Sequence, residues 1–134
     1  MLPMEREIEI AEKQLGCSLP GDYVAFRSGL AGEDARIGDR QLFFWPVEEL
    51  AYYNEGYDVE TSAPGLILFG TDGGLEAYGF DTRDGRMTVL TIPFVPMDWR
   101  EAIPCGRTFT GFLERLRHGG CFSTSGGQGY GDEG

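Results

Sequence analysis

The chain has 134 residues, of which 41% are hydrophobic, and this suits one compact domain that buries a core without metal or disulfide cross-links. Its 11 basic and 22 acidic residues give a formal net charge of −11. That charge disfavours binding to nucleic acid or an anionic membrane and favours a basic partner, although by itself it indicates no more than solubility.

The start of the chain and its apolar runs predict where the protein is located. No apolar run approaches the roughly 20 residues that cross a bilayer. The opening segment MLPMEREIEIAEK is acidic where a signal peptide begins with basic residues. We therefore expect a cytoplasmic protein.

The cysteines Cys17, Cys105 and Cys121 are an odd number and contain no Cys-x-x-Cys spacing. This pattern argues against a disulfide framework and against a zinc site. We therefore expect reduced thiols, no structural metal and no cofactor.

Two amphipathic helices are predicted near the N-terminus. The first begins around Pro3, carries apolar residues at helical spacing and ends at Gly16. The second begins around Pro20 and is closed by the glycines of residues 29–32. Its apolar stripe is typical of a core face and consists of Leu19, Tyr23 and Phe26.

The middle of the chain predicts strands, with one short helix between them. A strand pair is expected around Gly38 and Asp39, and Pro46 can start a short helix that runs through Tyr53. Residues 54–65 are expected to form a loop. The apolar run LILFG and the alternating segment LEAYGFD then predict a hairpin over residues 66–80.

The paired glycines at positions 73 and 74 raise the alternative of a phosphate-binding loop. Such a loop presents backbone N–H groups at the start of a helix, whereas the residues after Gly74 alternate with the period of a strand. The carboxylate of Asp72 would also repel a phosphate. We therefore expect the glycines to supply the positive φ angles of a tight turn.

The C-terminal third predicts one more strand and one helix. The strand covers residues 86–92 after a turn at Asp84 and Gly85, and the helix covers residues 108–117 with Thr108 or Arg107 near its cap. The inner face of this helix consists of Phe109, Phe112, Leu113 and Leu116. Residues 1–118 are predicted to form the domain, and the glycine-rich residues 119–134 a mobile tail.

This order of elements predicts the fold class. Helices come first, then consecutive strands joined by short turns, then a helix. We expect an α+β fold with a mainly antiparallel sheet, the hairpin of residues 66–80 at its centre, and the N-terminal and C-terminal helices packed on one side.

Candidate partner-binding residues are polar or aromatic side chains without an evident role in the core. The candidates are Trp45, Glu48, Glu49, Tyr53, Asp58, Glu60, Asp72 and Glu76, and the cluster around the short helix and its loop also holds Tyr52, Asn54, Glu55 and Tyr57. Tyrosine rings interleaved with carboxylates suit a basic protein surface, because the rings supply contact area and the acids steer the encounter. A solvated loop with one or two inward tyrosines explains the same pattern, and Trp45 fits either the core or a partial anchor.

The sequence contains no convincing catalytic arrangement. His118 is the only histidine, so a Ser-His-Asp or Cys-His arrangement has a single possible base. Asp72 and Glu76 across the hairpin can in principle act as acid and base, but such pairs are common in a chain with 22 acidic residues. The segment DTRDG lacks the ligand spacing of a calcium loop and is expected to be a turn. We expect no enzymatic activity; a carboxylate-dependent hydrolase is the weakest alternative.

Four segments also carry a resemblance to a known family. IEIAEKQLGCSLPGDYVAFRSGLAG, FFWPVEEL, ILFGTDGGLEAYGFD and RTFTGFLERL occur in the order seen in the SUKH superfamily, in the branch that includes the fungal cell-wall synthesis regulators. The resemblance runs from about residue 8 to 116, and PFVPMDWREAIPCG has no counterpart in it. The matching positions are mostly architectural and comprise Gly16, Leu19, Pro20, Tyr23, Phe26, Trp45, Pro46, Glu49, Leu50, Gly70, Asp72, Gly73, Gly74, Phe109 and Phe112.

The resemblance implies a non-enzymatic protein-binding module. Bacterial members are commonly immunity proteins that neutralise a cognate toxin, often a nuclease, whereas the fungal members are regulatory partners. We therefore expect a cognate protein partner, in particular a basic toxin domain, with a regulatory or scaffold role as the alternative. The sequence specifies neither the binding face nor the oligomeric state.

Overall fold

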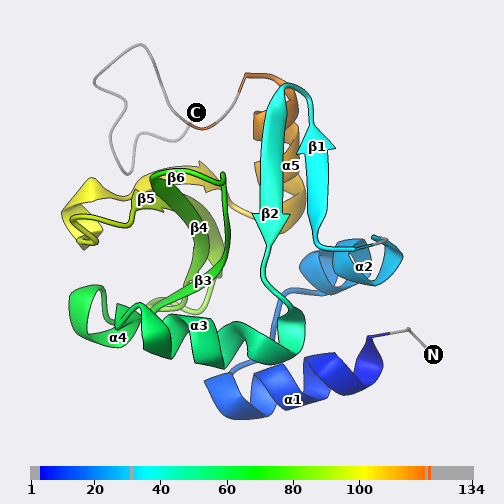
Figure 1. Cartoon of the computed structure of the whole chain (residues 1–134), viewed down its shortest axis with the longest axis vertical. Helices are drawn as coiled ribbons and strands as arrows, with labels where there is room; N and C mark the ends of the chain where they lie inside the picture. The colour runs from blue at the N-terminus through cyan, green and yellow to red at the C-terminus, as the bar shows by residue number, and fades with distance from the viewer. Residues whose placement is uncertain (1–3, 31, 120, 122–134) are drawn as a thin grey trace.

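The structure is a computed structural model that describes residues 4–30, 32–119 and 121 (Figure 1). Six antiparallel strands form one sheet in the order β1-β2-β3-β4-β5-β6. The strands are β1 (Asp34–Ile37), β2 (Arg40–Phe44), β3 (Leu66–Thr71), β4 (Glu76–Asp81), β5 (Thr88–Pro93) and β6 (Ile103–Gly106). The helices are α1 (Glu5–Leu15), α2 (Gly21–Gly29), α3 (Leu50–Gly56), α4 (Val59–Ser62) and α5 (Phe109–Arg117), with 3₁₀ turns η1 (Val47–Glu49) and η2 (Trp99–Glu101). The predicted α+β class with a central β3–β4 hairpin is confirmed.

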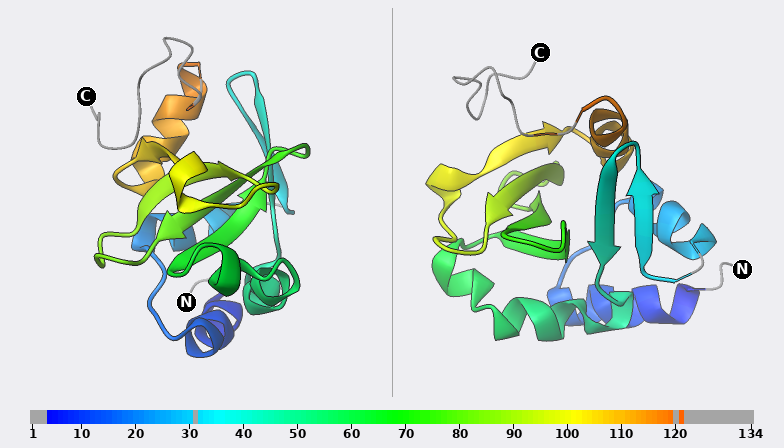
Figure 2. Two further views of the ribbon diagram at one scale, coloured as in Figure 1. Left: turned by 90° about the vertical axis from the view of Figure 1, so that its left-hand side faces the viewer. Right: turned by 45° about the horizontal axis from the view of Figure 1, so that its top comes forward.

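The sheet is curled rather than flat. In register, β2 pairs with β3 only at Phe43↔Thr71 and Phe44↔Gly70, and one further bond joins the Trp45 N–H to the Phe69 carbonyl at 3.0 Å. The β1–β2 hairpin therefore stands apart from the curved part formed by β3–β6 (Figures 1 and 2). Among the described residues, no strand lies beside the β2-facing edge of β3 from Leu66 to Leu68.

The side chain of Asn54, on α3, occupies that open edge. Its Oδ1 accepts the Leu68 N–H at 2.8 Å, and its Nδ2 donates to the Leu68 carbonyl at 3.0 Å and to the Leu50 carbonyl at 2.8 Å. The amide thus makes the two bonds that a neighbouring strand would make to Leu68. This contact fixes α3 against the sheet.

An aromatic cluster forms the centre of the core. Tyr23 of α2 is fully buried, and its ring lies 5.3 to 6.4 Å from four other rings. These four are Phe44, Phe69, Phe80 and Phe109. Residues from α2, β2, β3, β4 and α5 meet here, so the aromatic stripe of the second helix is a core face, as expected.

Arg27, one turn after Tyr23 on α2, is also completely buried. Its Nη1 donates to the Trp45 carbonyl at 3.0 Å, and its guanidinium lies 4.9 Å from the centroid of the Phe44 ring. The side chain ties the end of β2 to α2 through the backbone of Trp45.

Two elements were not predicted, α4 and β6. The helix α4 has only four residues, which is too few to show an amphipathic period in the sequence. It follows Asp58, whose φ of 58° is left-handed. The strand β6 also has four residues and contains Pro104 opposite Leu90 of β5. A proline is tolerated there because β6 is the edge of the sheet, but in the sequence it reads as a loop residue.

The expectation of reduced thiols without a disulfide was wrong. Cys105 of β6 and Cys121 form a disulfide with a Cα–Cα distance of 4.9 Å, and both residues are buried. Cys17 is free. The odd cysteine count excluded complete pairing but left room for one bond and one free thiol. Cys121 lies beyond the predicted domain boundary at residue 118, whereas residues 120 and 122–134 of the predicted tail lie outside the described part of the chain.

We expect Asn54→Ala to lower the free energy of unfolding by ~1–3 kcal/mol, because it leaves the buried N–H and carbonyl of Leu68 without partners. Urea denaturation measures the change. The control is Gln14→Ala, which removes an exposed amide from α1 and should stay within about 0.5 kcal/mol of the parent. Equal stabilities of the two variants would show that the Asn54 contacts do not support the fold.

Thiol chemistry tests the disulfide. Burial raises the pKa of the Cys17 thiol, and the carboxylate of Glu12 raises it further. Because the thiolate is the reactive form, alkylation should be run in denaturant, where both effects are removed. Without reductant we expect one alkylated cysteine by mass spectrometry, and with reductant three. Cys121→Ser should lower the free energy of unfolding by ~2–3 kcal/mol, as for a bond that closes a loop of this size. Three reactive thiols in protein purified without reductant would contradict the pairing.

Candidate partner-binding surface

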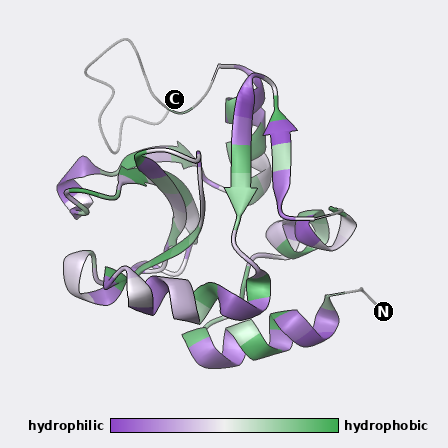
Figure 3. Ribbon diagram, viewed as in Figure 1, coloured by the Kyte–Doolittle hydropathy of each residue, from purple (hydrophilic) through white to green (hydrophobic). Residues whose placement is uncertain are grey.

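Four of the predicted carboxylates lie on the exposed surface of one continuous segment. Glu48 and Glu49 belong to η1, and Asp58 and Glu60 lie at the start of α4. In Figure 3, α1 and α3 carry hydrophilic residues along much of their length. The structure thus brings these four side chains to solvent around α3.

Trp45 lies beneath this segment. Its side chain is 9% exposed, and its ring is stacked against Tyr53 at 4.9 Å and against Tyr57 at 5.6 Å, with interplanar angles of 14° and 13°. Tyr53 and Tyr57 are four residues apart along the chain, which places both on the same side of the helical turn. Trp45 is therefore a core residue that supports the exposed ring of Tyr57 from below.

Asp72 lies in the turn between β3 and β4, and Glu76 is the first residue of β4. Oδ1 of Asp72 accepts the N–H of Gly74 at 2.8 Å and that of Glu76 at 3.3 Å, and Gly73 has a φ of 87°. The paired glycines form the predicted hairpin turn. The carboxylate of Asp72 shapes this turn, so its contacts explain the residue without catalysis.

Glu76 has an unusual electrostatic environment. Burial raises the pKa of its carboxyl above the usual 4.5, and the carboxylates of Asp72 and Glu101 raise it further. A hydrogen bond from the Thr91 hydroxyl, at 3.1 Å, lowers it in part. The pKa of the neighbouring Tyr78 rises to about 12, mainly through burial and secondly through Asp72.

A band of exposed and half-buried apolar side chains connects α3 with the β3–β4 turn. We call it the apolar strip; it consists of Phe43, Tyr52, Tyr53, Tyr57, Leu75, Phe94 and Val95. Leu75 and Val95 are 82% and 88% exposed. The rings of Tyr57 and Phe94 lie 4.9 Å apart, and the Phe94 N–H donates to the Leu75 carbonyl at 2.9 Å. At one end the Tyr52 ring contacts Tyr53, and at the other the Phe43 ring packs against Gly73.

The sequence prediction missed four members of this strip, Phe43, Leu75, Phe94 and Val95. Two of them carried a usable signal. Leu75 follows a Gly-Gly turn and Val95 stands between two prolines, so both are apolar residues at places where a strand cannot bury them. Exposed apolar area rimmed by polar side chains is typical of protein-binding surfaces.

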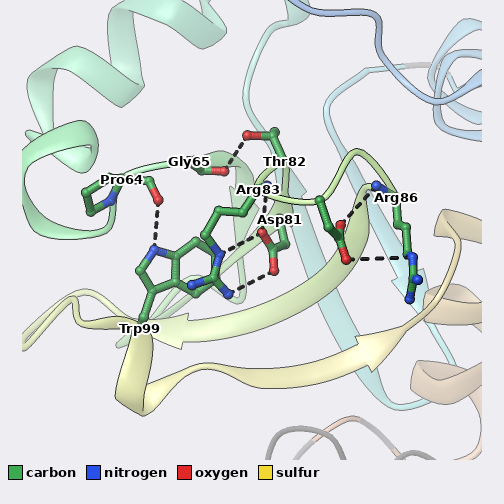
Figure 4. A network of polar contacts seen from close by, with 8 residues as sticks. Pro64, Gly65, Asp81, Thr82, Arg83, Arg86 and Trp99 are labelled. Atoms are coloured by element: carbon green, nitrogen blue, oxygen red, sulfur yellow. Dashed lines mark hydrogen bonds and ion pairs between the residues drawn. The ribbon is translucent and has the colours of Figure 1, made fainter.

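The segment DTRDG forms a turn, as expected, and Figure 4 shows how it is held. The Asp81 carboxylate accepts Nε and Nη2 of Arg83, both at 3.0 Å, and the Arg83 guanidinium lies 3.5 Å from the centroid of the Trp99 ring. Trp99 Nε1 donates to the Pro64 carbonyl at 2.9 Å, and the Thr82 hydroxyl donates to the Gly65 carbonyl at 2.7 Å. This cluster clamps the β4–β5 turn to the segment before β3, and its carboxylate is engaged by an arginine.

His118 is exposed and directly follows the last residue of α5, with Nε2 3.6 Å from Oε1 of Glu114. Within residues 4–30, 32–119 and 121, no group of three histidine, cysteine, aspartate or glutamate side chains is placed to hold a metal ion. In the same part of the chain, no helix has the length and apolar character needed to cross a membrane.

Glu76→Gln should stabilise the protein at neutral pH. The folded pKa of Glu76 is raised, so its favourable contribution is complete below the unfolded pKa and is lost as pH rises through the folded value. Glutamine keeps an acceptor for Thr91 without the charge. We expect the melting temperature to rise by about 1–3 °C at pH 7, and the difference to vanish below about pH 4.

Glu33→Gln, the same change at an exposed site, is the control for net charge in this thermal-melting series. An equal gain in both variants, or a Glu76→Gln gain that persists at low pH, would contradict the assigned cause.

No curated protein matches this chain. The family model described as SMI1 / KNR4 family (SUKH-1) matches residues 3–115, most of the chain. Proteins of the SUKH family are generally non-enzymatic immunity or regulatory proteins and are associated with binding of partner proteins. The chain belongs to the SMI1 / KNR4 family (SUKH-1), within the SUKH superfamily.

Proposed function

We propose that this protein is a non-enzymatic binding module that acts as an immunity protein, neutralising a cognate toxin with a basic surface. The observation that carries the proposal is the apolar strip flanked by exposed carboxylates. Such a surface combines two physical roles, since rings and aliphatic side chains lose water on contact while the acids attract a basic partner from a distance.

Charge and burial assign different kinetic roles to the two parts of the surface. The carboxylates Glu48, Glu49, Asp58 and Glu60 are exposed, so their attraction to a partner is screened by salt and acts mainly on association. The Tyr57 ring is 46% exposed and rests on Trp45, a rigid support that lowers the entropy lost on binding. Its loss should act mainly on dissociation.

Two other functions are alternatives for the same structure. A regulatory or scaffold protein of this fold would use the same strip on a different partner. A carboxylate-dependent hydrolase would need Asp72 and Glu76 free to act, whereas Asp72 accepts two backbone N–H groups and Glu76 accepts the Thr91 hydroxyl. A cytoplasmic location is part of the proposal, although the disulfide between Cys105 and Cys121 is uncommon in that compartment.

The test co-expresses this chain with the toxin-like product of the adjacent gene and measures survival and complex formation. We expect protection, a complex, and an association rate that falls as salt rises. Replacing Glu48, Glu49, Asp58 and Glu60 together by lysine should slow association more than it speeds dissociation. Tyr57→Ala should raise the dissociation rate about 5- to 150-fold, equivalent to ~1–3 kcal/mol.

Ile10→Ala is the matched control, because Ile10 is 40% exposed on α1 and lies outside the strip. It should leave both rates unchanged. If no neighbouring product binds and the purified protein shows turnover that mutation of Asp72 or Glu76 abolishes, the hydrolase replaces the immunity role. If Tyr57→Ala and Ile10→Ala behave alike, the strip is not the contact surface.

A further inference from the structure

A groove runs between α1 and the segment from η1 to α4. It consists of two adjoining hollows of about 510 and 550 Å³, which share Gln14 of α1 and Ala51 and Glu55 of α3. Figures 1 and 2 show α1 and α3 running beside each other in this region, and the two helices are in contact. We call this hollow the α3 groove.

The floor and the walls of the α3 groove differ in character. The floor includes the apolar side chains of Leu15, Val59, Leu66 and Ile67, the last three of them buried. The walls carry five exposed carboxylates, Glu48, Glu49, Glu55, Asp58 and Glu60. Among the described residues, no lysine, arginine or histidine lines either hollow.

The wall carboxylates are not neutralised within the described part of the chain. None of the five takes part in an ion pair there. The one hydrogen bond that their side chains accept in this part of the chain is long, at 3.5 Å from the Gly65 N–H to Oε1 of Glu60. Five like charges around an apolar floor repel one another and attract cations. Lysine and arginine match both features, since their aliphatic stems can lie on the floor while their charged ends reach the walls.

We propose that the α3 groove receives a lysine- and arginine-bearing segment of the partner protein. This inference rests on the proposed function and names the part of the partner that enters the groove. Tyr52, 72% exposed, lines the groove and contacts Tyr53 of the apolar strip. One partner can therefore cover both surfaces, with its apolar contact on the strip and its basic segment in the groove.

Charge selects this occupant over others. A second copy of the chain carries the same net charge of −11 and would be repelled, as would nucleic acid. Residues of η1, α3 and α4 line the groove one after another, and a helical segment of about 12 residues, at about 1.5 Å per residue, is a suitable probe.

The test uses a synthetic peptide of about 12 residues with lysines on one helical face and leucines on the other. The comparison peptide has glutamate in place of each lysine. NMR titration of the full chain should show shifts centred on Gln14, Ala51, Tyr52 and Glu55 with the basic peptide, weakening as salt rises. The acidic peptide should cause none.

A pair of charge-matched variants separates the groove from general acidity. The groove variant carries Glu48→Gln, Glu49→Gln, Glu55→Gln, Asp58→Asn and Glu60→Gln; asparagine suits the left-handed conformation at position 58. The control variant neutralises five exposed carboxylates elsewhere, Glu5, Glu9, Glu33, Asp34 and Asp39. Circular dichroism confirms that both fold. The groove variant should bind the basic peptide about tenfold or more weakly, and the control within about threefold.

Each other outcome overturns the inference. Equal losses in the two variants would mean attraction by net charge alone, and shifts centred outside the groove would place the basic segment elsewhere. A dimer in analytical ultracentrifugation that only the groove variant abolishes would identify a second copy as the occupant. Failure of the proposed function gives a different result, because the parent chain would then form no complex with the toxin. A groove variant that binds the toxin as the parent does, while Tyr57→Ala does not, would remove only this inference.

Discussion

The short pairing between β2 and β3 is the constraint on which the rest of the structure depends. After two residue pairs and one further backbone bond, the strands separate and leave an edge of β3 inside the protein. Buried backbone groups need partners, and Asn54 supplies them for Leu68 with one planar amide. A side chain thus takes the place of a strand, and in doing so it positions α3 along the sheet edge.

The placement of α3 determines the two surfaces described above. With Asn54 turned toward β3, Tyr53 meets the ring of Trp45, and Tyr57, just after the helix, stacks on the same ring. The opposite side of α3 carries Tyr52 and Glu55 and faces α1 across the groove. One helix therefore contributes the ring of Tyr53 to the apolar strip and the side chains of Tyr52 and Glu55 to the groove. A partner that meets both sides would gain contact area and electrostatic attraction from the same seven-residue element.

The electrostatics of the hairpin turn are consistent with binding. Asp72 is used to shape the turn and Glu76 is partly buried beside other carboxylates, which disfavours its charged form. A raised carboxyl pKa is often found at catalytic sites. Here the group faces a threonine hydroxyl and further acids, and the single histidine of the chain is on α5 beside Glu114. The contacts of Asp72 and Glu76 are therefore explained by the local structure, and the family is associated with binding of partner proteins.

The sequence by itself determined the elements whose signals are local. Gly16 ends α1 with a φ of 78°, Thr108 caps α5 by accepting the Gly111 N–H, and the β3–β4 turn follows from its glycines. The exposed carboxylates around α3 were also predicted, because charged side chains in a polar segment remain in water.

Tertiary structure alone decided the rest. The strand β6 exists because β5 offers it a backbone edge, and Cys105 meets Cys121 because the chain returns to β6 after α5. Trp45 is buried because the rings of Tyr53 and Tyr57 cover it, and Leu75 becomes part of the apolar strip only because Phe94 lies beside it. These contacts join residues 8 to 19 positions apart, and no local pattern of residues encodes them.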